Sequence, residues 1–95
     1  MGGTVVKGRS LAKHIGSGTV WLAFDATTDD YLCSWRDDSS GHVLEEGRAA
    51  SEAAAVDWGR ARTQQVVFQN GGDRFWAGTG SAPSGMAGYW SDDAT

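Results

Sequence analysis

The sequence predicts an α+β domain in which an antiparallel sheet of about four to five strands carries one main helix on one face. Short β-branched and aromatic runs separated by turn residues indicate hairpin-connected strands. One alanine-rich amphipathic stretch, residues 52–62, indicates a single helix. A length of 95 residues allows one domain. The expected order of elements is β-β-β-α-β-β.

The strands before the helix are expected between residues 4 and 36. Residues 4–11 alternate weakly, which favours a short first strand. Residues 19–26, TVWLAFDA, are β-branched and aromatic, and both of their faces are apolar, as in a central strand. Residues 31–36, YLCSWR, alternate, and the short gap before them predicts a hairpin. Residues 37–50 are polar and predict a loop, with or without a helical turn from Leu44.

The helix is expected over residues 52–62. Ser51 can accept a hydrogen bond from an amide of the first turn, and the charges of Glu52 and of the two final arginines suit the helix dipole. Gly59 weakens the helix but allows close approach to a sheet. The i, i+3, i+4, i+7 spacing predicts a packed face with a tryptophan as its main anchor: Ala54, Ala55, Trp58 and Ala61.

A second hairpin and a tail are expected after the helix. Residues 64–69 and 73–78 flank an Asn-Gly-Gly turn, and Asn-Gly is the strongest short hairpin signal. We therefore expect one α+β domain over residues 1–78. Residues 79–95 have the Gly/Ser-rich composition of a flexible tail, which ends in an aromatic and acidic segment.

Composition indicates a folded cytoplasmic protein. Five Trp, three Phe and two Tyr provide a large apolar surface to bury. Cys33 is the single cysteine, so no internal disulfide can form, which favours a reducing compartment. The sequence shows neither an apolar run near the roughly 18 residues of a membrane span nor the apolar core of a signal peptide. We expect no association with a membrane.

The distribution of charge disfavours nucleic acid as a partner. The net charge is −4, and nine acidic residues lie within residues 25–57. Affinity for phosphate usually needs a basic stripe. Only the N-terminal Lys7, Arg9 and Lys13 form a basic segment, and they support the alternative of a nucleic-acid-associated regulator.

The helix and the strand after it resemble known small proteins. An SEAA helix start and a W-G-R-x-R helix end followed by a strand are similar to HicB-type antitoxin domains and to small uncharacterised actinobacterial and phage proteins. The chain has six Arg and only two Lys, a preference typical of proteins from GC-rich genomes such as those of actinobacteria and their phages. The resemblance implies an antitoxin-like α+β fold, and it is carried by Ser51, Glu52, Ala53, Ala54, Trp58, Gly59, Arg60 and Arg62.

Residues that could carry chemistry have plainer interpretations. Cys33 with His14 or His42 could be a nucleophile and a base, but a thiol in the middle of a strand is typically core packing. The acidic stretch 37–46 does not have the spacing of a calcium loop. The glycine-rich stretches 16–19 and 78–81 lack the lysine of a phosphate loop. We therefore expect no enzyme activity, cofactor or metal.

The aromatic residues exceed what a small core can bury, which predicts a binding surface. Phe75 and Trp76 must lie on opposite faces of their strand, and interfaces favour Trp, Tyr and Arg. A homodimer, or coverage by the C-terminal tail, is the alternative. Tyr89 and Trp90 could dock on a partner or fold back on the sheet. The candidate partner-binding residues are Trp76, Arg74, Arg36, Trp35, Tyr89 and Trp90.

Together these features predict a small non-enzymatic protein-interaction module. A phage or actinobacterial accessory protein that modulates a host or partner protein fits them, as does an antitoxin-like neutraliser. The acidic stretch 25–57 could complement a basic partner and speed its association. A nucleic-acid regulator, for which Trp21, Tyr31, Trp35, Phe75 and Trp76 would offer a stacking platform, is the alternative.

Overall fold

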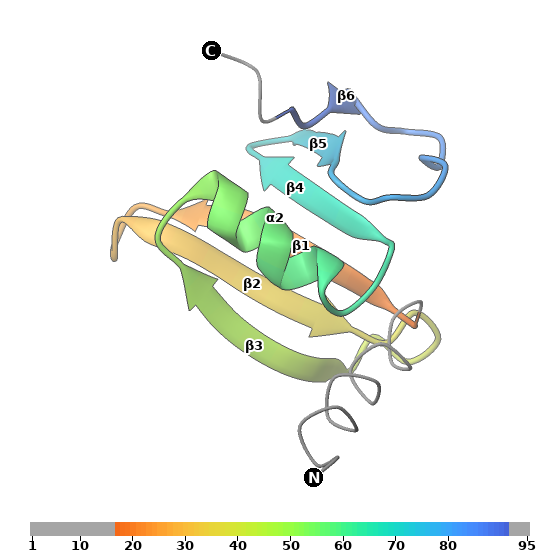
Figure 1. Cartoon of the computed structure of the whole chain (residues 1–95), viewed down its shortest axis with the longest axis horizontal. Coiled ribbons are helices and arrows are strands. Elements are labelled where there is room, and N and C mark those ends of the chain that lie inside the picture. Colours follow the sequence, from red (N-terminus) through yellow and green to blue (C-terminus); the bar gives the residue numbers. More distant parts are fainter. Residues whose placement is uncertain (1–16, 92–95) are drawn as a thin grey trace, which may run out of the picture.

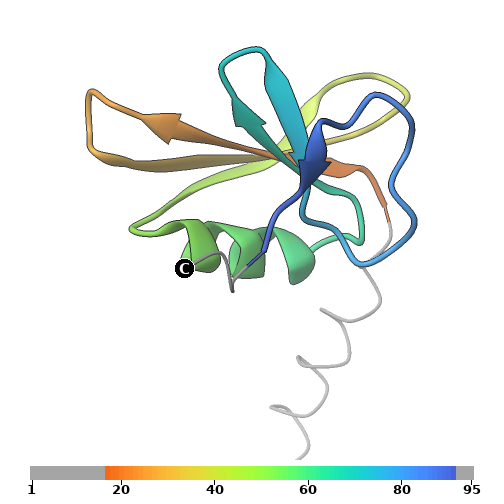
Figure 2. The same ribbon diagram turned by 90° about the horizontal axis from the view of Figure 1, so that it is seen from above.

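The computed structural model describes residues 17–91, which form a six-stranded mixed sheet with one helix against one of its faces (Figures 1 and 2). The expected α+β class, with a helix packed on a sheet, is confirmed. The expected strand at 4–11 lies outside the described residues. The elements are β1 (Thr19–Asp25), β2 (Asp30–Arg36), β3 (Val43–Ala49), α2 (Glu52–Arg60), β4 (Val66–Asn70), β5 (Asp73–Trp76) and β6 (Gly88–Tyr89).

The expectation of a purely antiparallel sheet is wrong, because two of the strand pairs are parallel. The order across the sheet is β3-β2-β1-β4-β5-β6. After β3 the chain crosses the sheet through α2 and enters β4 beside β1, running in the same direction. A helical crossover produces parallel neighbours, whereas a tight turn produces antiparallel ones. The short β6 likewise pairs in parallel with β5, after a return loop over residues 77–87.

Both predicted hairpins are confirmed. β1 and β2 pair antiparallel in a continuous register from Thr19 opposite Arg36 to Asp25 opposite Asp30. β4 and β5 are joined by the two-residue turn Gly71–Gly72, with Asn70 opposite Asp73. These local signals hold because each needs only a turn and the two strands beside it.

Residues 43–49 form strand β3, so the prediction of a loop or a helical turn there is wrong. β3 pairs antiparallel with β2, and Cys33 lies opposite Gly47. A side chain at Gly47 would stand only 2.7 Å from Nε1 of Trp58, so the glycine leaves space for that indole. The strand is thus specified by its pairing and by the helix above it, which override its weak intrinsic propensity.

The helix begins as predicted, but its buried face is different. The Ser51 hydroxyl accepts a hydrogen bond from the amide of Ala54 at 3.1 Å, so Ser51 is the N-cap. The buried positions are Ala55, Val56 and Gly59, whereas Ala54 and Ala61 of the expected face are exposed. Trp58 is half-buried at the flank of this face. The expected face is thus confirmed at Ala55, and Trp58 does pack against the core, but it is wrong at Ala54 and Ala61, whose places are taken by Val56 and Gly59.

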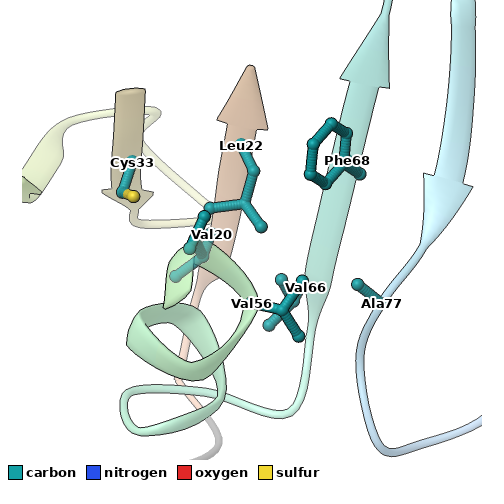
Figure 3. Packing of buried hydrophobic residues seen from close by; sticks show 8 residues of the cluster. Val20, Leu22, Cys33, Val56, Val66, Phe68 and Ala77 are labelled. Carbon is teal, nitrogen blue, oxygen red and sulfur yellow. The ribbon is translucent and has the colours of Figure 1, made fainter. Parts of the chain in front are cut away.

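The core lies between α2 and the centre of the sheet. A Cβ at Gly59 would lie 3.0 Å from methyl groups of both Val20 and Val66, which shows how closely the helix approaches β1 and β4. This confirms the close approach expected at Gly59. Figure 3 shows the surrounding cluster, which consists of Val20, Leu22, Cys33, Ala55, Val56, Val66, Phe68 and Ala77.

The sheet continues past the domain boundary expected at residue 78. β6 pairs with β5, and Trp90 packs against the edge of the core cluster. The segment with Tyr89 and Trp90 thus folds back on the sheet, with Trp90 packed against the core and the Tyr89 side chain exposed. Within residues 17–91, α2 is too short and too polar for a membrane crossing, and no other helix there meets that requirement.

Candidate interaction surface

The sheet face opposite α2 carries two arginines and a tryptophan around a shallow pocket. Alternation places them there, because Val20, Leu22, Val66 and Phe68 point toward the helix and their neighbours in sequence point away. The pocket has a volume of about 220 Å³. We call this surface the arginine–tryptophan face, and its residues are Trp21 on β1, Arg36 on β2, Gln69 on β4 and Arg74 on β5.

The two arginines of this face have no carboxylate partner in the part of the chain that the structure describes. Among residues 17–91 the ion pairs involve Arg48 and Arg62. Arg74 instead lies with its guanidinium carbon 5.4 Å from the centre of the Trp21 ring, a cation–π contact. Arg36 donates from Nε to the hydroxyl of Ser34 at 3.1 Å. Both arginines are exposed, so their charges remain available to an anionic group.

Trp76 belongs to the same face by register, but it is not exposed as predicted. Its side chain is 4% exposed, and it lies opposite Val67 on β4. The indole Nε1 donates to the carbonyl oxygen of Gly80 at 2.9 Å, and the backbone at Gly78 packs against the ring. The return loop therefore covers Trp76, which is the alternative of coverage by the C-terminal segment. A partner could contact this indole only if the loop moved.

Tyr89 extends the face at the sheet edge. β6 places Tyr89 opposite Trp76, on the side away from α2. The side chain is 71% exposed, more than any other large apolar side chain among residues 17–91. Of the candidate residues, the structure thus brings Arg36 and Arg74 to one pocket and places Tyr89 at the margin of that face.

Trp35 and Trp90 lie on the other side of the sheet. Trp35 is half-buried against the core, and its Nε1 donates to the carbonyl oxygen of Ser17 at 2.8 Å. Trp90 packs beside α2, where its Nε1 donates to Glu52 at 3.1 Å and its ring lies 5.9 Å from the guanidinium carbon of Arg60. These two residues therefore cannot act together with Arg36 and Arg74 in one contact patch.

Cys33 has the environment of a packing residue. Its side chain is fully buried in the core cluster, on the same side as Tyr31 and Trp35. Burial raises the pKa of the Cys33 thiol, so the reactive thiolate is disfavoured at neutral pH. Its partner His14 lies outside the described residues, and His42 lies in the exposed segment before β3. The geometry gives no support to Cys33 as a nucleophile.

The two aspartates before β3, Asp37 and Asp38, accept hydrogen bonds from neighbouring polar groups. The Asp37 carboxylate accepts from the hydroxyls of Ser39 and Ser40 and from the amide of Ser40, and these bonds lower its pKa. Asp38 accepts from Thr19 and Gln65. Over residues 17–91 no group of three or more His, Cys, Asp or Glu side chains is arranged to hold a metal ion.

Trp21 and Gln69 are the members of this face that were not predicted as partner-binding residues. The sequence alone suggests core packing or base stacking for Trp21, since both faces of residues 19–26 are apolar. Strict alternation from Val20 and Leu22 places it on the outer face, so the signal was present in the sequence.

No protein-family model, curated protein or solved structure matches the chain. The resemblance to HicB-type domains and to small actinobacterial and phage proteins therefore stays a prediction from the sequence.

Proposed function

We propose that this chain is a small non-enzymatic protein-interaction module whose arginine–tryptophan face binds an acidic segment of a partner protein. The observation that carries the proposal is the pair Arg36 and Arg74, two exposed arginines beside the ring of Trp21 that have no carboxylate partner within residues 17–91. Arginine recognises carboxylates through its planar fork of donors, and Arg and Trp are the residues that most often dominate binding energy at interfaces.

The pocket supports a carboxylate as the group that is bound. Gln69 adds an amide donor between the strands that carry Trp21 and Arg74. The half-buried indole of Trp21 offers an apolar surface for the stem of an Asp or Glu side chain. The mechanism is occlusion, in which this face covers a functional segment of a partner such as a host factor or a toxin.

Single-stranded nucleic acid is the second candidate, because an indole between two arginines is also the arrangement of a base-stacking platform. The net charge of −4 weakens this candidate, since phosphate affinity scales with the number of cations in contact.

Affinity capture from lysate of the source organism tests the proposal, with and without nuclease. We expect one dominant protein to survive nuclease treatment and to be lost with the double variant Arg36→Gln/Arg74→Gln. Arg48→Gln is the matched control, because it removes a positive charge that is already paired with Asp25 and Asp30. The Arg48→Gln variant should still capture the partner protein.

Two other outcomes would redirect the proposal. Capture that is lost with nuclease, and that weakens steeply with salt, would support the nucleic-acid candidate. Capture that persists in the Arg36→Gln/Arg74→Gln variant would show that the arginine–tryptophan face is not the contact surface.

A further inference from the structure

A second pocket lies on the helix side of the sheet, between the first turn of α2 and strands β4 to β6. Its volume is about 210 Å³. The register explains its position, because Phe68 and Phe75 are cross-strand partners on the face that α2 leaves partly uncovered. We call it the Glu52 pocket, and the lining residues used below are Glu52, Phe68, Phe75 and Trp90.

The pocket contains a carboxylate that forms no ion pair with any cation in the described part of the chain. Glu52 is the first residue of α2, where an acidic side chain interacts favourably with the helix dipole. One of its oxygens, Oε1, accepts the hydrogen bond from Nε1 of Trp90. None of the ion pairs formed within residues 17–91 includes Glu52. A negative charge is therefore held at the wall of the pocket by the hydrogen bond from Trp90, with the neutral Tyr31 hydroxyl also interacting with it and no cationic partner among residues 17–91.

Aromatic rings form the rest of the wall. Phe68 is almost completely buried and Phe75 is half-buried, so the two rings are held in place. The faces of aromatic rings carry partial negative charge and attract cations. The guanidinium carbon of Arg60 lies 5.9 Å from the centre of the Trp90 ring, within the range of a cation–π contact. Carboxylate and rings thus favour the same kind of ligand, a cation with an apolar stem.

We infer that the Glu52 pocket binds a lysine side chain of the partner protein, with its ammonium group at Glu52 and its hydrocarbon stem against Phe68 and Phe75. The inference rests on the proposal that this chain binds a protein. Lysine fits better than arginine because the Trp90 indole already occupies Oε1 and the Tyr31 hydroxyl interacts with the same carboxylate. The carboxylate can therefore still attract a point charge, but it does not offer two open oxygens to a bidentate guanidinium. A neutral apolar group would remove water from the carboxylate without compensation.

The test is an NMR titration of the full chain with Nα-acetyl-lysine methylamide, and the Trp90 indole N–H is the reporter. Trp90→Phe identifies that resonance. We expect a saturable shift at millimolar concentrations, and none with the Nε-acetylated analogue, which has the same stem without the charge. Glu52→Gln should weaken binding about fivefold or more. Glu46→Gln, which removes an exposed acid from the opposite face of the sheet, should leave it unchanged.

Failure of this inference is distinguishable from failure of the proposed function. An equal shift with the neutral analogue, or no saturable shift with either probe, would overturn the lysine pocket, whatever the capture experiment shows. A shift that saturates with the lysine probe while capture finds no protein would show that the pocket binds an amine. It would overturn the inference that this amine is a lysine of a partner protein. The Arg36→Gln/Arg74→Gln variant should titrate as the wild type does, because it changes the other face.

Discussion

The guanidinium carbon of Arg62 lies 3.7 Å from the centre of the Trp58 ring, so the cation is stacked directly on the indole. Arg62 also donates to both carboxylate oxygens of Glu45 at 2.9 Å and to the carbonyl oxygen of Trp58 at 2.9 Å. One side chain thereby joins the end of α2 to the edge strand β3. The indole beneath it fills the space that Gly47 leaves open.

Replacement of this arginine by lysine should measure the value of the stacked and bidentate geometry. We expect Arg62→Lys to lower the free energy of unfolding by about 1 kcal/mol. The compact ammonium group cannot stack on the Trp58 ring as the planar guanidinium does and at the same time bind both oxygens of Glu45. Urea unfolding followed by Trp fluorescence measures it. Arg74→Lys is the matched control, since Arg74 has no carboxylate partner within residues 17–91, and it should change stability by less than about 0.5 kcal/mol. Equal losses in the two variants would contradict a clamp at Arg62.

Stability should decrease as the pH falls below about 4.5. The hydrogen bonds from Arg62 hold the pKa of Glu45 below its ordinary value of 4.5, and those from Thr27 and Arg48 do the same for Asp25. A carboxyl whose pKa is lower in the folded state stabilises the fold above its unfolded pKa, and this contribution is lost as pH falls through its folded pKa. Thermal unfolding between pH 7 and pH 2.5 measures the trend. The difference in melting temperature between wild type and Glu45→Gln should be largest at neutral pH and should shrink in acid; a constant difference would contradict the ion pair.

Trp76 should behave as a core residue, because its side chain is almost completely buried. Trp76→Phe keeps a ring in place but removes the hydrogen bond to the Gly80 carbonyl oxygen, and we expect a loss of about 1–2 kcal/mol. Trp21→Phe is the same chemical change on the same face of the sheet, at a side chain that is only half-buried, and it should cost less than about 1 kcal/mol. Chemical denaturation of both variants decides the point. A larger loss at Trp21 would mean that the return loop does not protect Trp76.

The parts of the fold that were predicted correctly depend on short-range chemistry. The Asn70-Gly71 turn specifies its own hairpin, and the Ser51 hydroxyl caps a helix that begins at the next residue. Alternation also placed Cys33 on the same side as Tyr31 and Trp35, where the register confirms them. In each case the deciding interaction lies within a few residues along the chain.

The parts that were predicted wrongly depend on contacts between distant segments. β3 is a strand because it pairs with β2 and receives Trp58 above Gly47, and its own residues carry no clear alternation. Parallel pairing follows from the path of α2, which hairpin signals do not encode. The candidate site shows the same division. Arg36 and Arg74 were expected on one surface, and they do line one pocket. The burial of Trp76, in contrast, depends on the path of the loop 77–87, which lies over its ring and accepts its indole hydrogen bond at Gly80.

The return loop itself is open to a direct test at Gly78. An added Cβ there would overlap the backbone carbonyl oxygen of Gln64 and lie 2.7 Å from the Trp76 ring. The Gln64 carbonyl cannot easily move aside, because it accepts the amide of Thr79 at 3.0 Å. We therefore expect Gly78→Ala to destabilise the fold by about 2 kcal/mol or more.

Gly72→Ala provides the control for this prediction. It adds the same methyl group at an exposed turn position with no neighbouring atom within 4 Å, and it should stay within about 0.5 kcal/mol of wild type. Urea unfolding midpoints of the two variants give the comparison. If Gly78→Ala were as stable as Gly72→Ala, the loop could not be packed on Trp76 as described. That indole would then be available on the outer face, and Trp76 would return to the set of contact residues beside Arg36 and Arg74.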